Sequence, residues 1–194
     1  MRSLAFLILV LTAMTGACGD PFALQPAVIL NAVDTVEIYA VNGTPLDRPS
    51  GYSIGERDAG SRLVRLGLEA RSFDFLYRID ATNGPEFAPF SVVSPPPAGQ
   101  STAGQSGFLA STAGFDAIKE AEQVGYVTDK PVKLVEGTVL LARSTISASC
   151  FVQIPYYAKI EVISFDPAAR SVKFRILSDV NCGYRGLEPG LPTR

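Results

Sequence analysis

Hydrophobic and polar residues alternate along two neighbouring segments of the chain, 156–165 and 172–177. A period of two places one set of side chains on a buried sheet face and the other set toward water. Asp166 and Pro167 open the connection between the segments, because proline fixes φ and the aspartate side chain can bond the backbone that follows. The pattern therefore predicts an antiparallel hairpin whose buried face carries Ala158, Ile160, Val162, Val172, Phe174 and Ile176.

The same alternation predicts further strands earlier in the chain. Residues 35–41 alternate and end at Asn42-Gly43, which is a strong tight-turn signal. Residues 73–79 and 86–93 flank the turn 80–84 and form a second hairpin. The turn side chains Asp80, Asn83 and Glu86 lack EF-hand spacing, which favours a plain turn over a calcium loop. Residues 62–66 are a short strand candidate, whereas the segment 45–60 is polar and turn-rich.

The continuous apolar run Val139-Leu140-Leu141 suits a strand that is covered on both faces. The segment from Thr112 to Gly125 is instead expected to be helical. Its apolar residues are spaced for one helix face, Thr112 can cap the first turn and Gly125 can end the last one.

Residues 94–107 are rich in proline, glycine and serine, and we expect an extended surface loop, with a partner-binding element as the alternative. The fold class that these patterns predict is mostly β: an antiparallel sandwich or open barrel with one short helix and one disulfide.

The N-terminus has the pattern of an export signal. Arg2 precedes an apolar run over residues 4–14, which is too short to span a bilayer comfortably. The run ends in Thr15-Gly16-Ala17-Cys18, which resembles the lipobox of bacterial lipoproteins. The resemblance implies that residues 1–17 are removed and that Cys18 is lipidated, so that the protein is extracytoplasmic and anchored to a membrane. Ordinary signal cleavage and an uncleaved anchor are the alternatives. Residues 18–34 then form a tether, and residues 35–194 a single β-rich domain.

The cysteine count fits this compartment. With Cys18 lipidated, Cys150 and Cys182 remain, and an even remainder in an exported chain predicts one disulfide. A reactive thiol pair is the alternative, which the lack of a C-x-x-C spacing disfavours.

The composition limits the chemistry. The sequence contains no histidine, and its two methionines, Met1 and Met14, lie in the signal segment. Histidine-based general-base catalysis, histidine ligation of zinc and haem ligation by histidine or methionine are therefore not expected. No phosphate-binding glycine motif is present, and a net charge of −2 gives no reason to expect nucleic acid. We expect no cofactor and no enzymatic activity, although paired carboxylates of a polysaccharide hydrolase need not be close in sequence.

Basic and aromatic residues near the C-terminal hairpin are candidates for a partner surface. The alternation places Lys159, Lys173 and Arg175 on the water-facing side, and a solvated outer face is the alternative. The tyrosines Tyr156, Tyr157 and Tyr184 could line the same surface or flank the core.

The run from Gly137 to Leu177 resembles strands of haem-binding lipoproteins of the HmuY type. The shared features are an apolar strand ending in Arg143-Ser-Thr, the sequence Tyr157-Ala-Lys159, and a paired strand. The resemblance implies a β-rich lipoprotein fold without haem, because the histidines are absent.

The leading functional hypothesis is a non-catalytic, membrane-anchored lipoprotein that binds a protein partner of the cell envelope, for example as an accessory subunit of a membrane complex. The alternative is a carrier of small apolar ligands with a pocket of several hundred Å³. A third hypothesis is the carboxylate-based hydrolase.

Overall fold

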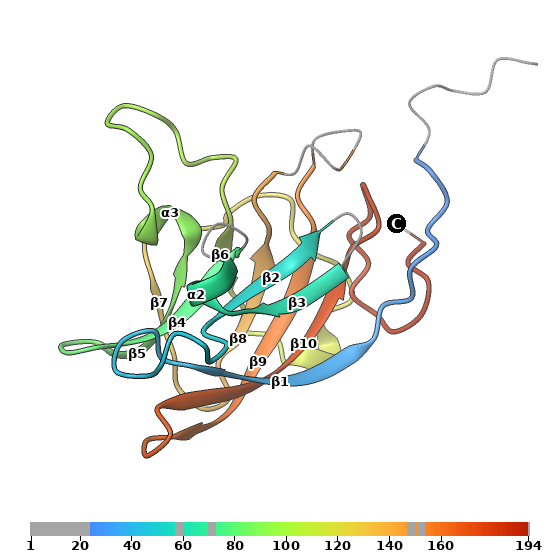
Figure 1. The fold of residues 1–194 in the computed structure, drawn as a ribbon. Coiled ribbons are helices and arrows are strands. Elements are labelled where there is room, and N and C mark those ends of the chain that lie inside the picture. Colours follow the sequence, from blue (N-terminus) through green and yellow to red (C-terminus); the bar gives the residue numbers. More distant parts are fainter. Residues whose placement is uncertain (1–23, 57–59, 70–72, 147–149, 151–153, 194) are drawn as a thin grey trace, which may run out of the picture.

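The computed structural model describes residues 24–56, 60–69, 73–146, 150 and 154–193, and consists of two antiparallel sheets packed face to face (Figure 1). The prediction of a mostly β fold is confirmed. The first sheet runs in the order β1 (Val33–Tyr39), β10 (Ser171–Asp179), β9 (Tyr157–Asp166), β8 (Val139–Arg143) and β6 (Gly107–Ala110). The second runs in the order β3 (Gly60–Val64), β2 (Gly51–Glu56), β4 (Phe75–Asp80), β5 (Gly84–Pro89) and β7 (Val132–Lys133).

Both predicted hairpins are present. In the β9–β10 hairpin the side chain of Asp166 accepts hydrogen bonds from the backbone N–H groups of Ala168 and Ala169, so it organises the turn as the sequence predicts. In the β4–β5 hairpin Tyr77 pairs with Phe87 across the two strands. The register of the first hairpin shifts once, between Lys173 and Phe174, which is a β-bulge.

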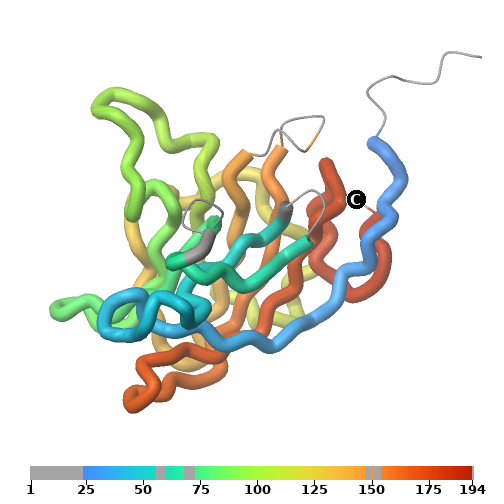
Figure 2. The backbone as a smooth tube through the Cα atoms, in the orientation of Figure 1, coloured from blue at the N-terminus to red at the C-terminus, as the bar shows by residue number. Residues whose placement is uncertain are grey.

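The first sheet joins the two ends of the domain, because β1 pairs along its whole length with β10. The second sheet is built mainly from the N-terminal half of the chain. The loop between the halves, residues 94–106, projects from one corner of the molecule as the light green excursion in Figures 1 and 2, in agreement with the predicted surface loop.

The main hydrophobic core lies between the two sheets and is rich in aromatic rings. Phe75 of β4 contacts the rings of Phe87, Phe108 and Phe174, with centroids 4.9–6.3 Å apart. These rings come from both sheets, so their burial holds the sandwich together. Every inward residue predicted for β9 and β10 belongs to this core: Ala158, Ile160, Val162, Val172, Phe174 and Ile176.

A second apolar cluster covers the outer face of the first sheet. It includes Leu141, Tyr157 and Leu177 of the sheet, together with Phe115 and Leu187 from outside it. As predicted, β8 is therefore buried on both faces, with Leu140 in the main core and Leu141 in the outer cluster. We refer to this second group as the outer cluster.

The predicted helix over residues 112–125 is wrong. Only the short 3₁₀ turn η1 (Phe115–Ala117) forms there, and the backbone then runs extended against the C-terminal tail. The N–H of Ala121 donates to the oxygen of Arg185, and the N–H of Leu187 donates to the oxygen of Lys119. These long-range bonds and burial in the outer cluster outweigh the weak helix preference of so short a segment.

The segment 45–60 also differs from expectation, since it contains strand β2 within a stretch predicted to be turns. Tyr52 and Ile54 point into the main core, while their neighbours in the strand, Gly51, Ser53 and Gly55, are small. The small residues gave the segment its turn-like composition. A Cβ at Gly55 would lie 2.5 Å from a ring carbon of Tyr156, so close packing requires glycine there. Among the residues that the structure describes, the other helices are the single turns α2 (Leu66–Glu69) and α3 (Phe90–Val93).

The predicted disulfide is confirmed. Cys150 and Cys182 are bonded, with their Cα atoms 5.4 Å apart and a sequence separation of 32 positions. The bond ties the connection between β8 and β9 to the start of the C-terminal tail. Cys18 and the remainder of the proposed lipobox lie outside the described residues.

Candidate functional site

The structure does not bring the predicted basic residues together on an open surface. Lys159 is only 3% exposed, and its ammonium group donates a hydrogen bond to the oxygen of Ile118. Arg175 forms ion pairs with Glu161 and Asp116. Of these three basic residues, only Lys173 is exposed. The prediction that Lys159 faces water was wrong because the segment carrying η1 covers this part of the sheet.

The three predicted tyrosines occupy three different environments. Tyr156 is buried in the main core, and Tyr157 is buried in the outer cluster. Tyr184 is partly exposed, and its hydroxyl donates to the backbone oxygen of Gln25 at 3.0 Å. These tyrosines therefore line no common surface with the basic residues.

A cleft opens between the sheets at the side where their edge strands β1 and β3 lie. We call it the inter-sheet cleft, and its volume is about 450 Å³. Val33 and Asp34 of β1 lie on one side, Gly60 and Ser61 of β3 lie on the other, and Tyr52 contributes to the floor. The cleft thus combines residues from strands of both sheets.

Tyr52 gives the cleft a polar group above the aromatic core. Its ring stacks on Phe75 at a centroid separation of 5.6 Å and meets Phe174 edge-on. Burial raises the pKa of the Tyr52 phenol, and hydrogen bonding with the hydroxyl of Ser61 partly offsets that effect. The phenol therefore stays neutral at physiological pH and can donate or accept a hydrogen bond.

Apolar side chains form one rim of the cleft, where Ile29, Leu30 and Val33 line it and Val28 precedes them in sequence. Val28 and Leu30 are 79% and 68% exposed, and Ile29 and Val33 are also exposed. We call these four residues the apolar strip. Four large apolar side chains within six positions, beside an open cleft, have the character of an interaction surface rather than of scattered surface residues.

Buried amides hold the apolar strip in place. The side-chain oxygen of Asn181 accepts hydrogen bonds from the backbone N–H groups of Val28 and Ile29, both at 3.0 Å. Its NH₂ group donates to the oxygen of Ile29 at 2.9 Å. Asn31 exchanges backbone hydrogen bonds with Gly190 of the C-terminal tail, which lies beside this segment in Figure 1. The strip is thus fixed to the domain rather than part of a loose tether.

Sequence reasoning missed this site, although one signal was present. The run Ala27-Val28-Ile29-Leu30 is continuously apolar, which is unusual for a segment interpreted as a tether. The other cleft residues come from distant parts of the chain, around positions 52, 61 and 176–180, and only the fold brings them together.

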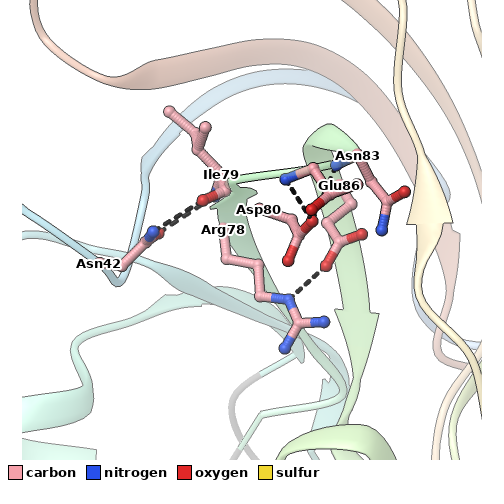
Figure 3. A network of polar contacts seen from close by, with 7 residues as sticks. Asn42, Arg78, Ile79, Asp80, Asn83 and Glu86 are labelled. Carbon is pink, nitrogen blue, oxygen red and sulfur yellow. Dashed lines mark hydrogen bonds and ion pairs between the residues drawn. The ribbon is translucent and has the colours of Figure 1, made fainter.

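The turn considered for calcium is occupied by contacts within the hairpin (Figure 3). The Asp80 carboxylate accepts hydrogen bonds from the backbone N–H groups of Asn83 and Thr82, and these bonds lower its pKa. Glu86 forms an ion pair with Arg78. Among the residues that the structure describes, no group of three or more acidic, cysteine or histidine side chains is placed to hold a metal ion.

Comparison with models of protein families, with curated proteins and with solved structures found no match for this chain. Within the described ranges, no helix has the length and apolar character needed to cross a membrane.

Proposed function

We propose that this protein is a non-catalytic lipoprotein, exported and anchored to a membrane through Cys18, whose β-sandwich binds a protein partner of the cell envelope. The observation that carries the binding role is the apolar strip, held rigidly at the rim of the inter-sheet cleft. Such a patch costs free energy in water, and covering it with a partner recovers that cost.

The position of the strip supports a membrane-associated partner. Only nine residues separate Cys18 from Val28, and an extended chain spans at most about 3.3–3.6 Å per residue. A lipid on Cys18 would therefore keep Val28, at the start of the strip, within roughly 35 Å of the bilayer surface. A membrane protein of the envelope whose exposed domain extends that far from the bilayer could bind the strip.

The experiment compares purification of the lipidated protein from detergent-solubilised membranes with that of two variants. Leu30→Glu places a charge in the strip, and Val135→Glu places one at another apolar side chain that is 61% exposed. We expect a stoichiometric partner with the wild-type protein and with Val135→Glu, and its loss with Leu30→Glu. A photo-crosslinker at position 30 should join the same partner. A monomer without a co-purifying protein would contradict the proposal, as would equal capture by both variants.

The proposed anchor is tested separately by mass spectrometry of the N-terminus. A diacylated or triacylated peptide beginning at Cys18 is the expected species. An intact, unmodified N-terminus in a cytosolic fraction would contradict export and anchoring, whatever the binding result.

The alternative function, a carrier of small apolar ligands, is favoured by the volume of the inter-sheet cleft and by the Tyr52 phenol at its floor. Native mass spectrometry of the purified protein should then reveal a bound small molecule. Ser61→Trp, which introduces a large side chain at the mouth of the cleft, should abolish that binding. Retention of a partner by Ser61→Trp together with loss of the small molecule would separate the two functions.

A further inference from the structure

A second pocket lies on the outer face of the first sheet, and it shares no lining residue with the inter-sheet cleft. We call it the arginine pocket. The register pairs Arg143 at the end of β8 with Tyr157 at the start of β9, and the pocket opens beside this pair. Arg185 of the C-terminal tail contributes a second guanidinium group. The volume is about 360 Å³, within the range of roughly 300–1,000 Å³ that is usual for ligand pockets.

Arg143 has no carboxylate partner among the residues that the structure describes. Within the part of the chain that the structure describes, no carboxylate oxygen lies within 4.0 Å of it, and its buried Nε has no hydrogen-bond acceptor. One terminal nitrogen donates to the backbone oxygen of Ala103 at 2.5 Å. The guanidinium carbon lies 5.3 Å from the ring centroid of Tyr126, which fixes the orientation of the group.

Arg185 is already compensated. Its guanidinium forms an ion pair with Glu120 and donates to the backbone oxygen of Ala121 at 2.7 Å. Glu122 is exposed and does not line the pocket. The pocket therefore carries one uncompensated positive charge, which belongs to Arg143. A ligand with a single negative charge would balance that charge, whereas a dianion would leave an excess.

Apart from Gln123, the rest of the lining is apolar or aromatic: Val124, Ile154, Pro155, Gly183 and Tyr157. Carboxylate is the monoanion whose two oxygens match the planar donors of arginine, and the apolar lining can contact a hydrocarbon group next to it. Burial raises the pKa of Tyr157 although both arginines act in the opposite direction, so its hydroxyl remains a neutral donor at physiological pH.

We propose that the arginine pocket binds a small organic acid, a monocarboxylate with an apolar hydrocarbon part, and that Arg143 holds the carboxylate. This activity is separate from partner binding by the apolar strip, so either proposal can fail while the other stands.

The test is isothermal titration of the purified protein with octanoate below its micellar concentration, and with 1-octanol as the uncharged probe of the same length. We expect saturable binding of octanoate and at least tenfold weaker binding of octanol. Arg143→Gln should weaken octanoate binding at least tenfold, and Arg143→Lys should retain part of it. Lys130→Gln removes one positive charge from an exposed position and should change the affinity less than twofold.

Nuclear magnetic resonance of the wild-type protein tests the same binding site even if Arg143→Gln does not fold. Octanoate should shift the amide resonances of Arg143, Tyr157 and Arg185 in the wild-type protein and leave those of Tyr52 and Val33 in place. Absence of saturable binding, equal binding of octanol, or shifts confined to the inter-sheet cleft would each overturn the proposal.

Discussion

The ammonium group of Lys159 donates a 2.8 Å hydrogen bond to the backbone oxygen of Ile118, and it lies 4.6 Å from the ring centroid of Phe115. The side chain thereby joins the outer face of β9 to the segment that covers it. Arg175 lies over the same ring at 4.2 Å. A lysine that the sequence pattern places in water is thus a structural element of the outer cluster.

Replacement of Lys159 should measure this role. Lys159→Ala removes three buried methylene groups, at about 0.8 kcal/mol each, and leaves the Ile118 oxygen without its donor. We expect a loss of roughly 2–3 kcal/mol in the free energy of unfolding by urea denaturation. Lys159→Met keeps the apolar length and should cost only about 1 kcal/mol.

Lys173→Ala is the matched control for this measurement, because Lys173 is exposed on the neighbouring strand. Its unfolding free energy should stay within about 0.5 kcal/mol of the wild-type value. An equally small effect for Lys159→Ala would contradict the burial of Lys159.

Gly55 should not tolerate a side chain. A Cβ there would lie 2.5 Å from the Tyr156 ring and 3.0 Å from Val180, so Gly55→Ala should destabilise by about 1–3 kcal/mol through overpacking. Gly114 provides the control, because its φ of −66° suits alanine and no atom lies within 4 Å of the added methyl group. Gly114→Ala should be neutral or slightly stabilising in thermal denaturation. If both variants melt alike, β2 does not pack against Tyr156 as described.

Asp179 should make stability depend on pH. Burial raises the pKa of its carboxyl group above the ordinary value of 3.8, although hydrogen bonds from Asn181 act in the opposite direction. Between pH 3.8 and the raised pKa, the folded protein binds more protons at this carboxyl group than the unfolded chain does. The protonated carboxyl group therefore makes its full contribution to stability below pH 3.8, and that contribution is lost as the pH rises through the raised pKa.

Asp179→Asn should remove that dependence, because the amide is neutral at every pH. The variant should gain stability relative to the wild-type protein as the pH rises from about 3.5 to 7, by about 1.4 kcal/mol for each unit of pKa elevation. Urea denaturation across this range gives the comparison, and Asp129→Asn at an exposed position is the control. A constant difference between Asp179→Asn and wild type would contradict the assignment.

The disulfide should contribute much of the stability of the domain. Loss of the Cys150–Cys182 bond in the double serine variant should cost roughly 3–4 kcal/mol, since the bond joins positions that are 32 apart in sequence. Calorimetry should show a lower melting temperature for this variant and for the reduced wild-type protein. The reductant should not change the melting temperature of the double variant. A wild-type protein whose melting temperature is the same with and without the reductant would count against the prediction.

Local patterns predicted the strands that alternate strongly or are continuously apolar. The hairpin of β9 and β10 follows from the period of two, and β8 follows from Val139-Leu140-Leu141, because these patterns arise directly from burial on one or two sheet faces. The strand β2 was missed because Tyr52 and Ile54 alternate with glycine and serine, whose turn preference is a local property that packing against the aromatic core overrides.

The candidate sites depended on contacts that no local pattern encodes. The apolar strip is held on the domain because Asn181, more than 150 positions later, forms hydrogen bonds with the backbone of Val28 and Ile29. Arg143 was named only within a family resemblance, and its isolation from carboxylates is a property of its neighbours in space. The pairing of Cys150 with Cys182 was accessible from sequence only because two cysteines remained after Cys18 was assigned to the lipobox.

The sequence by itself determined the β-rich class and the two hairpins, since alternate residues of a strand face opposite sides of a sheet and the buried ones are apolar. Tertiary structure alone decided which faces are covered. The segment around Phe115 lies over Lys159 instead of forming a helix, because its backbone pairs with the C-terminal tail and its ring is buried on the sheet. A residue is exposed or buried according to what packs against it, and that partner can come from any part of the chain.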